Sequence, residues 1–329
     1  TSLMSTVNEK LRVGVVGVGY LGKFHAEKYA RMADIELVGV ADIDAAAAAA
    51  VADRLQTKAF NRHADLIGRV DAVSVVVPTS AHYLIAKEFL SNGVDVLIEK
   101  PMTSTLEEAD ALVAVAVDRG LIIQVGHLER FNPAVVALRD IVKRPLFIES
   151  HRLSMFRGRA TDVSVVLDLM IHDIDLITNF AQAELISVHA AGVPVVSGEV
   201  DIANARLEFD SGCVANVTAS RISIKDERKI RLFQRDCYTS VDFVDHRITV
   251  IRREGHDPSS LIPGMDIQQL SFPQGDALDD ELKAFVQSVR NRKPPQVDGR
   301  VGRDALRIAL DVMAQINSKI DRYLSLNHS

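Results

Sequence analysis

Residues 11–22 read Leu-Arg-Val-Gly-Val-Val-Gly-Val-Gly-Tyr-Leu-Gly, a short apolar run that leads into a glycine-rich turn. The turn itself, Gly17-Val18-Gly19-Tyr20-Leu21-Gly22, is a complete G-x-G-x-x-G. In this pattern the first glycine permits a tight turn, the second lets the backbone approach a pyrophosphate, and the third lets a helix pack close to the strand. The N-terminus of that helix offers free N–H groups to an anion. The stretch therefore predicts a dinucleotide site in an α/β domain.

The residues that follow the turn agree with this interpretation. We expect an amphipathic helix over 24–32 and a strand over 35–41, with Asp42 about twenty residues beyond the turn. A carboxylate at that position accepts hydrogen bonds from ribose hydroxyls and repels a 2′-phosphate. Ile43 and Asp44 come next, with no Arg or Lys to hold such a phosphate, so NAD is favoured over NADP. The structural alternative is a glycine turn that binds no cofactor.

The composition suits a two-domain protein and argues against several functional classes. The chain has 329 residues, 47% of them hydrophobic, and its net charge of −6 gives no electrostatic case for binding nucleic acid or an anionic membrane. No apolar run approaches the ~18 residues of a transmembrane helix. Cys213 and Cys237 lack metal-type spacing, so we expect two reduced thiols in a cytoplasmic protein. We expect residues 1–10 to be a disordered start or one added for expression.

Strand and helix patterns alternate through about the first 125 residues. Apolar runs at 71–77, 94–98 and 121–125 are typical of strands in a doubly wound, mostly parallel sheet. From about residue 186 strand-like runs dominate, several of them alternating in polarity, before two final helical segments. We therefore expect an α/β Rossmann domain over 11–126 and an α+β domain with a large open antiparallel sheet over 127–329. The last helices could pack back on the Rossmann domain.

The first candidate for chemistry is Lys100, in the sequence Glu99-Lys100-Pro101 at the end of the strand over 94–98. Ligands of such sheets bind just past the carboxyl ends of the strands, so this lysine would face the nicotinamide half of the cofactor. An ammonium there can polarise a substrate hydroxyl. A solvated lysine before a turn is the ordinary alternative. Pro78-Thr79-Ser80-Ala81-His82 stands at the corresponding place after the strand over 71–77.

The second candidate lies in the apolar segment 165–176. Asp168, His172 and Asp175 recur there at spacings of four and three, which places them on one face of a helix. An Asp four residues before a His can orient the imidazole and support its charged form, as a general base near neutral pH requires. A satisfied core histidine is the structural alternative. A metal site would need further ligands that are not evident, so we expect no metal.

These motifs together resemble the Gfo/Idh/MocA family of sugar and cyclitol oxidoreductases. The motifs that carry the resemblance are Gly17-x-Gly19-x-x-Gly22, Pro78-Thr79-x-x-His82, Glu99-Lys100-Pro101, Asp168-x-x-x-His172-x-x-Asp175, Glu281-Leu282-x-x-Phe285 and Gly302-x-x-x-Ala305-Leu306. The resemblance implies that His172 takes a hydroxyl proton as hydride leaves for the nicotinamide ring, with Asp168 beside it and Lys100 at the reacting hydroxyl. The residues it assigns to the cofactor are Gly17, Gly19, Tyr20, Leu21, Gly22, Asp42, Ile43, Pro78, Thr79, His82, Glu99 and Lys100.

Residues 125–133 and 162–173 look most like the branch of that family that acts on nucleotide sugars, the UDP-N-acetylglucosamine 3-dehydrogenases of an amino-sugar pathway for lipid A. This resemblance implies oxidation of C3 of a UDP-amino sugar to a ketone. Arginine can bind two phosphate oxygens at once, and the alternative for a group of arginines is a solvated loop. The residues expected near the substrate are Arg130, Asn132, Arg152, Arg157, Arg159, Asp168 and His172.

Other functions stay open at this point. A free-sugar or myo-inositol dehydrogenase of the same family would turn over substrates that carry no nucleotide. An NAD-binding regulatory protein would lack chemistry, but the presence of Lys100, Asp168 and His172 argues against it. Glycoside cleavage assisted by NAD without net redox is a further alternative. The resemblance also implies a homodimer or homotetramer through the C-terminal sheet, because an alternating sheet has an apolar face to cover.

Overall fold

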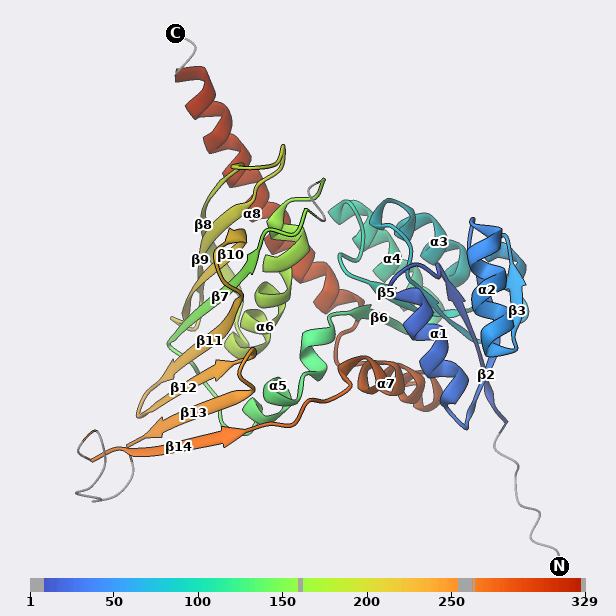
Figure 1. Cartoon of the computed structure of the whole chain (residues 1–329), viewed down its shortest axis with the longest axis horizontal. Helices are drawn as coiled ribbons and strands as arrows, with labels where there is room; N and C mark the ends of the chain where they lie inside the picture. The colour runs from blue at the N-terminus through green and yellow to red at the C-terminus, as the bar shows by residue number, and fades with distance from the viewer. Residues whose placement is uncertain (1–8, 159–161, 254–261, 263, 327–329) are drawn as a thin grey trace, which may run out of the picture. The chain divides into compact units, whose positions relative to one another are not determined.

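The computed structural model describes residues 9–158, 162–253, 262 and 264–326. The chain divides into two compact units, 1–128 with 277–304 and 129–276 with 305–329 (Figure 1). The first of the two C-terminal helices and the beginning of the second thus belong to the first unit. Most of the start expected to be disordered lies outside the described residues, as does Arg159. No helix within the described ranges is long and apolar enough to cross a membrane.

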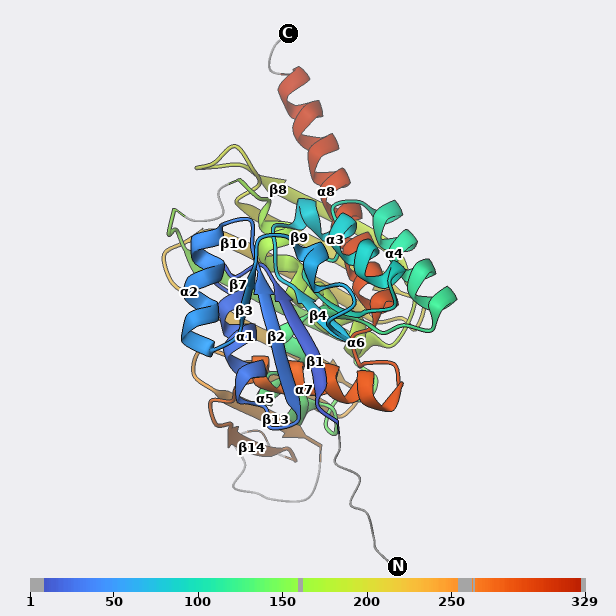
Figure 2. The same cartoon turned by 90° about the vertical axis from the view of Figure 1, so that its right-hand side faces the viewer.

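The first unit is built on a six-stranded parallel sheet in the order β3-β2-β1-β4-β5-β6 (Figure 2). Its strands are β1 (Leu11–Val16), β2 (Ile35–Ala41), β3 (Lys58–Phe60), β4 (Ala72–Val75), β5 (Asp95–Glu99) and β6 (Ile123–Gly126). Its helices are α1 (Gly22–Arg31), α2 (Ala45–Leu55), η1 (His63–Leu66), α3 (Thr79–Ser91), α4 (Leu106–Arg119) and α7 (Ala277–Asn291). The strand order reverses between β1 and β4, and ligands of doubly wound sheets bind at that reversal. The expected Rossmann fold is confirmed.

Local sequence explains why these elements begin and end where they do. Asp44 caps α2, because its carboxylate accepts hydrogen bonds from the N–H groups of Ala46 and Ala47 ahead of a run with high helix propensity. Thr105 and Glu108 form a capping box at the start of α4, and Gly120 ends that helix in a left-handed conformation. Residues that flank these helices thus fix where α2 begins and where α4 begins and ends.

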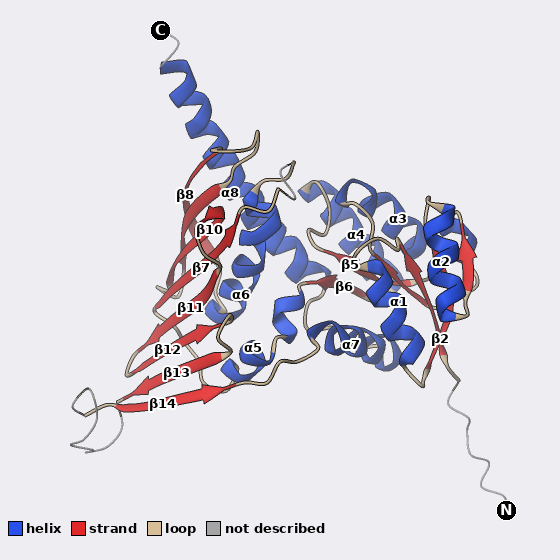
Figure 3. Ribbon diagram, viewed as in Figure 1, coloured by secondary structure: helices blue, strands red, loops and turns tan. Residues whose placement is uncertain are grey.

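The second unit contains an eight-stranded sheet in the order β14-β13-β12-β11-β7-β10-β9-β8 (Figure 3). Its strands are β7 (Phe147–Met155), β8 (Leu185–Val193), β9 (Ile202–Phe209), β10 (Val214–Ser223), β11 (Glu227–Gln234), β12 (Cys237–Asp242), β13 (Arg247–Arg252) and β14 (Asp266–Ser271). Its helical segments are η2 (Leu128–Phe131), α5 (Pro133–Leu138), the π-helical η3 (Val166–Met170), α6 (Ile171–Ala181) and most of α8 (Gly299–Leu326). The open antiparallel sheet is confirmed with one exception, since β7 and β10 pair in parallel.

The two faces of this sheet differ in chemistry. Alternate residues of the central strands, such as Ile148, Ile230 and Leu232, are fully buried beneath α5, α6 and α8, which lie along the same face (Figure 1). The opposite face carries charged and aromatic side chains and has no helix of the described part of this unit over it. The apolar face expected to need a second subunit is therefore covered by the unit's own helices.

Candidate functional site

The glycine-rich turn between β1 and α1 has three glycines with three different surroundings. Gly17 has φ +89°, and a methyl group on it would lie 2.2 Å from the carbonyl oxygen of Val76. A methyl group on Gly22 would lie 1.8 Å from the carbonyl oxygen of Gly17, so neither Gly17 nor Gly22 has room for a side chain. At Gly19 a methyl group would meet nothing within 4 Å. The backbone at Gly19 is thus open for a close approach, as a dinucleotide pyrophosphate requires.

Asp42 lies beside this turn and holds it in place. Its two carboxylate oxygens accept hydrogen bonds from the backbone N–H groups of Val18, at 2.8 Å, and of Asp44, at 2.9 Å. Each carboxylate oxygen has further acceptor capacity, so the half-buried side chain can still accept bonds from ribose hydroxyls. Tyr20 and Ile43 are exposed to 74% and 98%, which leaves apolar surface next to the site predicted for the adenosine half.

The segment after β4 is joined to the segment after β5 through His82. This side chain is buried, with Nε2 at 2.8 Å from the carbonyl oxygen of Val77 and Nδ1 at 3.0 Å from that of Pro101. Burial lowers the pKa of His82 and outweighs the hydrogen bonds to the two carbonyl oxygens, which act to raise it. The folded protein therefore favours the neutral ring. Thr79 begins α3 directly after Pro78. His82 therefore shapes the carboxyl edge of the sheet by linking two loops.

Glu99 and Lys100 follow at the end of β5. One oxygen of the Glu99 carboxylate lies 3.2 Å from Nε2 of the fully buried His25 in α1, an ion-pair distance without the alignment of a good hydrogen bond. Burial acts to raise the pKa of Glu99, but His25 and then the charge of Lys100 outweigh it and lower that pKa below its ordinary value. Glu99 is thus an ionised group that places a negative charge beside Lys100. No motif in the sequence pointed to His25.

Asp168 and His172 lie at a junction between two kinds of helix. Asp168 stands in the π-helical turn η3, and His172 in the first turn of α6. Both side chains are half-buried, whereas Val166, Met170 and Ile171 around them are fully buried. Spacings of four and three predict a regular α-helix, so the π turn is a departure from the predicted structure, although such turns are frequent at functional sites. Asp175, the third member of the motif, is buried and engaged elsewhere.

The arginines expected to bind phosphate have acidic partners within the second unit. Arg130 makes a two-point contact with Asp175 and reaches Asn179, while Arg152 makes a two-point contact with Asp173. Arg130 and Arg152 are both buried, at 4% and 7% exposure. Burial acts to lower the pKa of Arg152, but the charges of Asp173 and Glu129 outweigh it and raise that pKa. The structure thus places both guanidinium groups in the interior.

The remaining residues expected near the substrate have varied surroundings. Arg157 is largely exposed, and its guanidinium lies 2.8 Å from the carboxylate of Asp226. Asn132 caps α5 by accepting a hydrogen bond from the N–H of Ala134. In the described residues no group of three His, Cys, Asp or Glu side chains could hold a metal ion. Arg157 is therefore the exposed member of the expected arginine group among those the structure describes.

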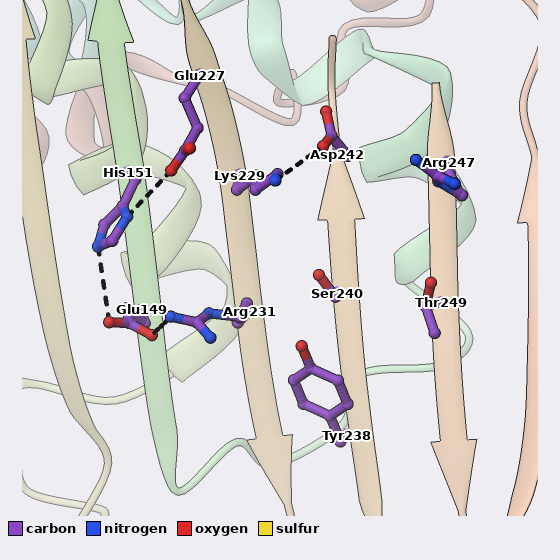
Figure 4. Close-up of a pocket in the computed structure, with 10 residues that line it drawn as sticks. All are labelled: Glu149, His151, Glu227, Lys229, Arg231, Tyr238, Ser240, Asp242, Arg247 and Thr249. Atoms are coloured by element: carbon purple, nitrogen blue, oxygen red, sulfur yellow. Dashed lines mark hydrogen bonds and ion pairs between the residues drawn. The ribbon is translucent and has the colours of Figure 1, made fainter. Parts of the chain in front are cut away.

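A large hollow on the second unit contains none of the predicted site residues. It has a volume of about 470 Å³ and lies on the uncovered face of the large sheet (Figure 4). Ion pairs cross it between His151 and Glu227 and between Lys229 and Asp242. Its complete lining is Glu149, His151, Glu227, Lys229, Arg231, Tyr238, Ser240, Asp242, Arg247 and Thr249. Its position on a flat sheet face marks it as a feature of that surface rather than of the dinucleotide site.

Two family models match two successive parts of the chain. The first, described as an oxidoreductase family with an NAD-binding Rossmann fold, matches residues 11–127, and the second, a GFO/IDH/MocA C-terminal domain, matches residues 145–251. The chain belongs to the Gfo/Idh/MocA family. It is therefore an oxidoreductase of CH–OH groups with NAD as its cofactor, and the open backbone at Gly19 with the carboxylate of Asp42 fits that dinucleotide.

Individual relatives agree with this membership. The UDP-N-acetylglucosamine 3-dehydrogenase of Acidithiobacillus ferrooxidans is 40% identical over 95% of this chain and 99% of its own. A solved structure of that enzyme has a TM-score of 0.89 and covers 94% of this chain and 98% of its own. The scyllo-inositol 2-dehydrogenase (NAD⁺) of Bacillus subtilis is 29% identical over 88% of this chain and 90% of its own. Both relatives are dehydrogenases of a ring hydroxyl, which agrees with the predicted reaction type.

Proposed function

We propose that this protein oxidises C3 of UDP-N-acetylglucosamine, or of a related nucleotide sugar, to the 3-keto form with NAD. The observation that carries the proposal is the 40% identity to a UDP-N-acetylglucosamine 3-dehydrogenase along 95% of the chain. Lys100, Asp168 and His172 supply the acid–base groups that such an oxidation needs. The product class fits an amino-sugar pathway for lipid A, which would place the protein in the cytoplasm.

The roles of the residues follow from their chemistry. The N–H groups at the glycine-rich turn would hold the pyrophosphate, and Asp42 the adenosine ribose. The ammonium of Lys100, beside the ionised Glu99, would donate a hydrogen bond to the reacting hydroxyl. His172 would accept the hydroxyl proton as general base, with Asp168 supporting the imidazolium that forms. When bound, NAD supplies the acceptor for the hydride.

A second function within the family keeps specific support. Buried carboxylates already engage Arg130 and Arg152, so fewer arginines than expected are available to a substrate diphosphate. An inositol dehydrogenase is also among the relatives that match most of the chain. A free-sugar or inositol dehydrogenase would use the same acid–base residues without the nucleotide, and it is the main alternative.

A substrate panel separates the two. NADH formation at 340 nm is followed with NAD and, in turn, UDP-N-acetylglucosamine, glucose and myo-inositol. In parallel runs with a 2-oxo acid, which would reoxidise bound NADH, the 2-hydroxy acid and the oxidised sugar are measured instead. We expect turnover on the UDP-sugar alone. Turnover on only a free polyol would replace the proposal with its alternative, and NAD binding without turnover on any of the three would favour a regulatory protein.

We further propose that the protein forms a homodimer or homotetramer through the uncovered face of the large sheet. Charges of both signs are interspersed on this face, and a row of aromatic rings, Phe147, Phe233 and Tyr238, crosses it at centroid distances of 5.5 and 4.9 Å. A surface that presents both signs can pair with itself in a two-fold interface. The aromatic row supplies apolar contact area to such a pairing.

A further inference from the structure

Helix α6 carries His172 just ahead of two buried aspartates. Asp173 is the next residue and Asp175 comes three positions after His172. The two aspartates are only 4% and 1% exposed. The guanidinium of Arg152 lies 2.9 and 3.0 Å from the two oxygens of Asp173. That of Arg130 lies 2.5 and 2.8 Å from those of Asp175. Each aspartate is therefore held by a planar, two-point contact.

The two contacts lie on either side of the direction in which His172 projects. Successive side chains of an α-helix are turned by about 100°, so Asp173 is about 100° to one side of His172 and Asp175 about 60° to the other. A two-point contact on one side alone would leave the helix able to roll about that contact. Contacts on both sides fix its rotation about its own axis, which is the motion that would swing His172 most.

The arginines come from elements that are themselves anchored. Arg152 lies on β7, in the middle of the large sheet, and Arg130 lies in η2, where Asn179 of α6 gives it a further partner. Glu129, next to Arg130 in η2, also contacts Arg152 and Arg228 of β11. The network therefore ties one helix to η2 and, through the sheet, to two of its strands.

Stability alone does not explain why charges occupy these positions. Replacement of a buried ion pair by apolar residues of similar volume is often neutral or stabilising, because burial costs both charges their hydration. The Arg–carboxylate fork does offer a fixed planar geometry that apolar packing lacks. Directional pairs on both sides of His172 thus suit a part of the protein whose orientation matters.

We propose that Arg130 and Arg152 are positioning residues that fix the rotation of α6 and so aim His172 at the substrate hydroxyl. This inference rests on the proposed function, because it takes His172 as the general base. It also replaces the expected role of these two arginines as ligands of a substrate diphosphate. The two roles predict different kinetic effects. Loss of a residue that binds the substrate raises KM, whereas misalignment of the general base lowers kcat.

The test compares Arg152→Lys and Arg130→Lys with a matched control, Arg221→Lys. Lysine keeps the charge but cannot form the fork. Arg221 is also a buried arginine of the second unit, 2.9 Å from Asp201, but neither residue lies on α6. We expect kcat to fall about 10- to 100-fold in the two α6 variants, with KM for the substrate changed less than about 3-fold. The control should lower the melting temperature by a similar amount and keep kcat.

Two further variants keep the outcome clear if a lysine variant is unstable. In Arg152→Met with Asp173→Leu the pair is replaced by apolar side chains, so we expect a near-normal melting temperature, normal NAD binding and a low kcat. In a His172→Ala background Arg152→Lys should lower kcat no further, because Arg152 acts on turnover through the imidazole that has already been removed. A multiplicative loss in that background, or a raised KM with normal kcat, would overturn the proposal.

The wild-type protein keeps this test separate from the proposed function. Turnover of the unaltered chain on the substrate panel decides the substrate, and every variant is then compared with wild type on the substrate that is turned over. If the wild type acts only on a free polyol, the nucleotide-sugar proposal is wrong. The ratio of variant to wild-type kcat on that polyol still tests whether the two arginines position His172.

Discussion

Lys100 and His172 are the two residues to which the proposed reaction assigns acid–base roles. We expect Lys100→Ala and His172→Ala each to lower kcat by about 10²–10⁴-fold, the usual loss when an acid–base group is removed. NAD should still bind, because the glycine-rich turn and Asp42 are untouched; binding is measured by titration with the cofactor. If either variant kept wild-type turnover, that residue would have no acid–base role.

Asp42 accepts a hydrogen bond from the glycine-rich turn and is proposed to bind the adenosine ribose, so one substitution removes both interactions. We expect Asp42→Ala to weaken NAD binding and to reduce discrimination against NADP, because the carboxylate that repels a 2′-phosphate is lost. Its bonds to the N–H groups of Val18 and Asp44 are lost as well, so affinity for both cofactors should fall. Dissociation constants for the two cofactors provide the ratio. An unchanged ratio would remove Asp42 from the ribose site.

Glu281 of α7 is fully buried, and neither carboxylate oxygen has a hydrogen-bond partner among the described residues. Burial, and then the charge of Glu99, raises its pKa well above the ordinary value of 4.5. The folded state therefore favours the protonated form. Its contribution to stability is complete below pH 4.5 and is lost as the pH rises through the folded-state pKa.

We accordingly expect Glu281→Gln to remove part of the fall in unfolding free energy that occurs as the pH rises above 4.5, because glutamine cannot ionise. Chemical denaturation at several pH values measures this slope. Asp110→Asn, at an exposed carboxylate paired with Arg303, is the control and should not flatten the slope in the same direction. A slope equal to that of wild type would mean that Glu281 is ionised in the folded protein.

At the scale of elements, the turn between β1 and α1 makes a prediction through two of its glycines. Gly19→Ala should keep the melting temperature, since its methyl group meets nothing within 4 Å, but it should lower NAD affinity at least about tenfold. Gly22→Ala should lower both the melting temperature and the NAD affinity, because its methyl group would lie 1.8 Å from a carbonyl oxygen. Thermal melts and cofactor titration distinguish the two, and normal NAD affinity in Gly19→Ala would place the pyrophosphate elsewhere.

Elements set by local sequence were predictable, whereas those set by distant partners were not. The strand over 35–41 follows from a β-branched apolar run and has the expected bounds. The edge strands β3 and β14 are short and largely exposed, so no apolar pattern marked them. The parallel pairing of β7 with β10 joins segments that are separated in the sequence by η3, α6, β8 and β9. The π turn at Asp168 departs from the regular helical spacing on which the prediction of one shared face rested.

At the scale of the whole molecule, the motifs predicted where several of the candidate site residues lie in the fold, while their role in a site stays a prediction. The glycine-rich turn, Asp42 and the Glu99-Lys100 pair could be located because each follows the end of a strand. The partners of the arginines could not, since Asp173 is 21 residues from Arg152 and Asp175 is 45 residues from Arg130. A basic residue near a site suggests a phosphate ligand until its acidic partner is known.

The uncovered sheet face provides a prediction about assembly. Ser240 lies in the hollow on that face and makes none of its ion pairs, so Ser240→Arg adds bulk and charge without breaking one. We expect this variant to shift the protein to smaller species in light scattering coupled to size exclusion. Ser91→Arg, at the exposed end of α3 in the other unit, should not. An unchanged mass for Ser240→Arg would move the interface to another surface.

Hydride transfer from C3 is the step that defines the proposed reaction, and deuterium at that carbon reports it. UDP-N-acetylglucosamine labelled with deuterium at C3 is incubated with the protein and NAD, and the mass of the reduced cofactor, or of the 2-hydroxy acid formed when a 2-oxo acid is supplied, is measured. We predict that one deuterium appears in that product and that the oxidised sugar nucleotide has lost its label. Where hydride transfer limits the rate, turnover should also be slower than with the unlabelled substrate. Turnover with the deuterium retained in the sugar would contradict oxidation at C3.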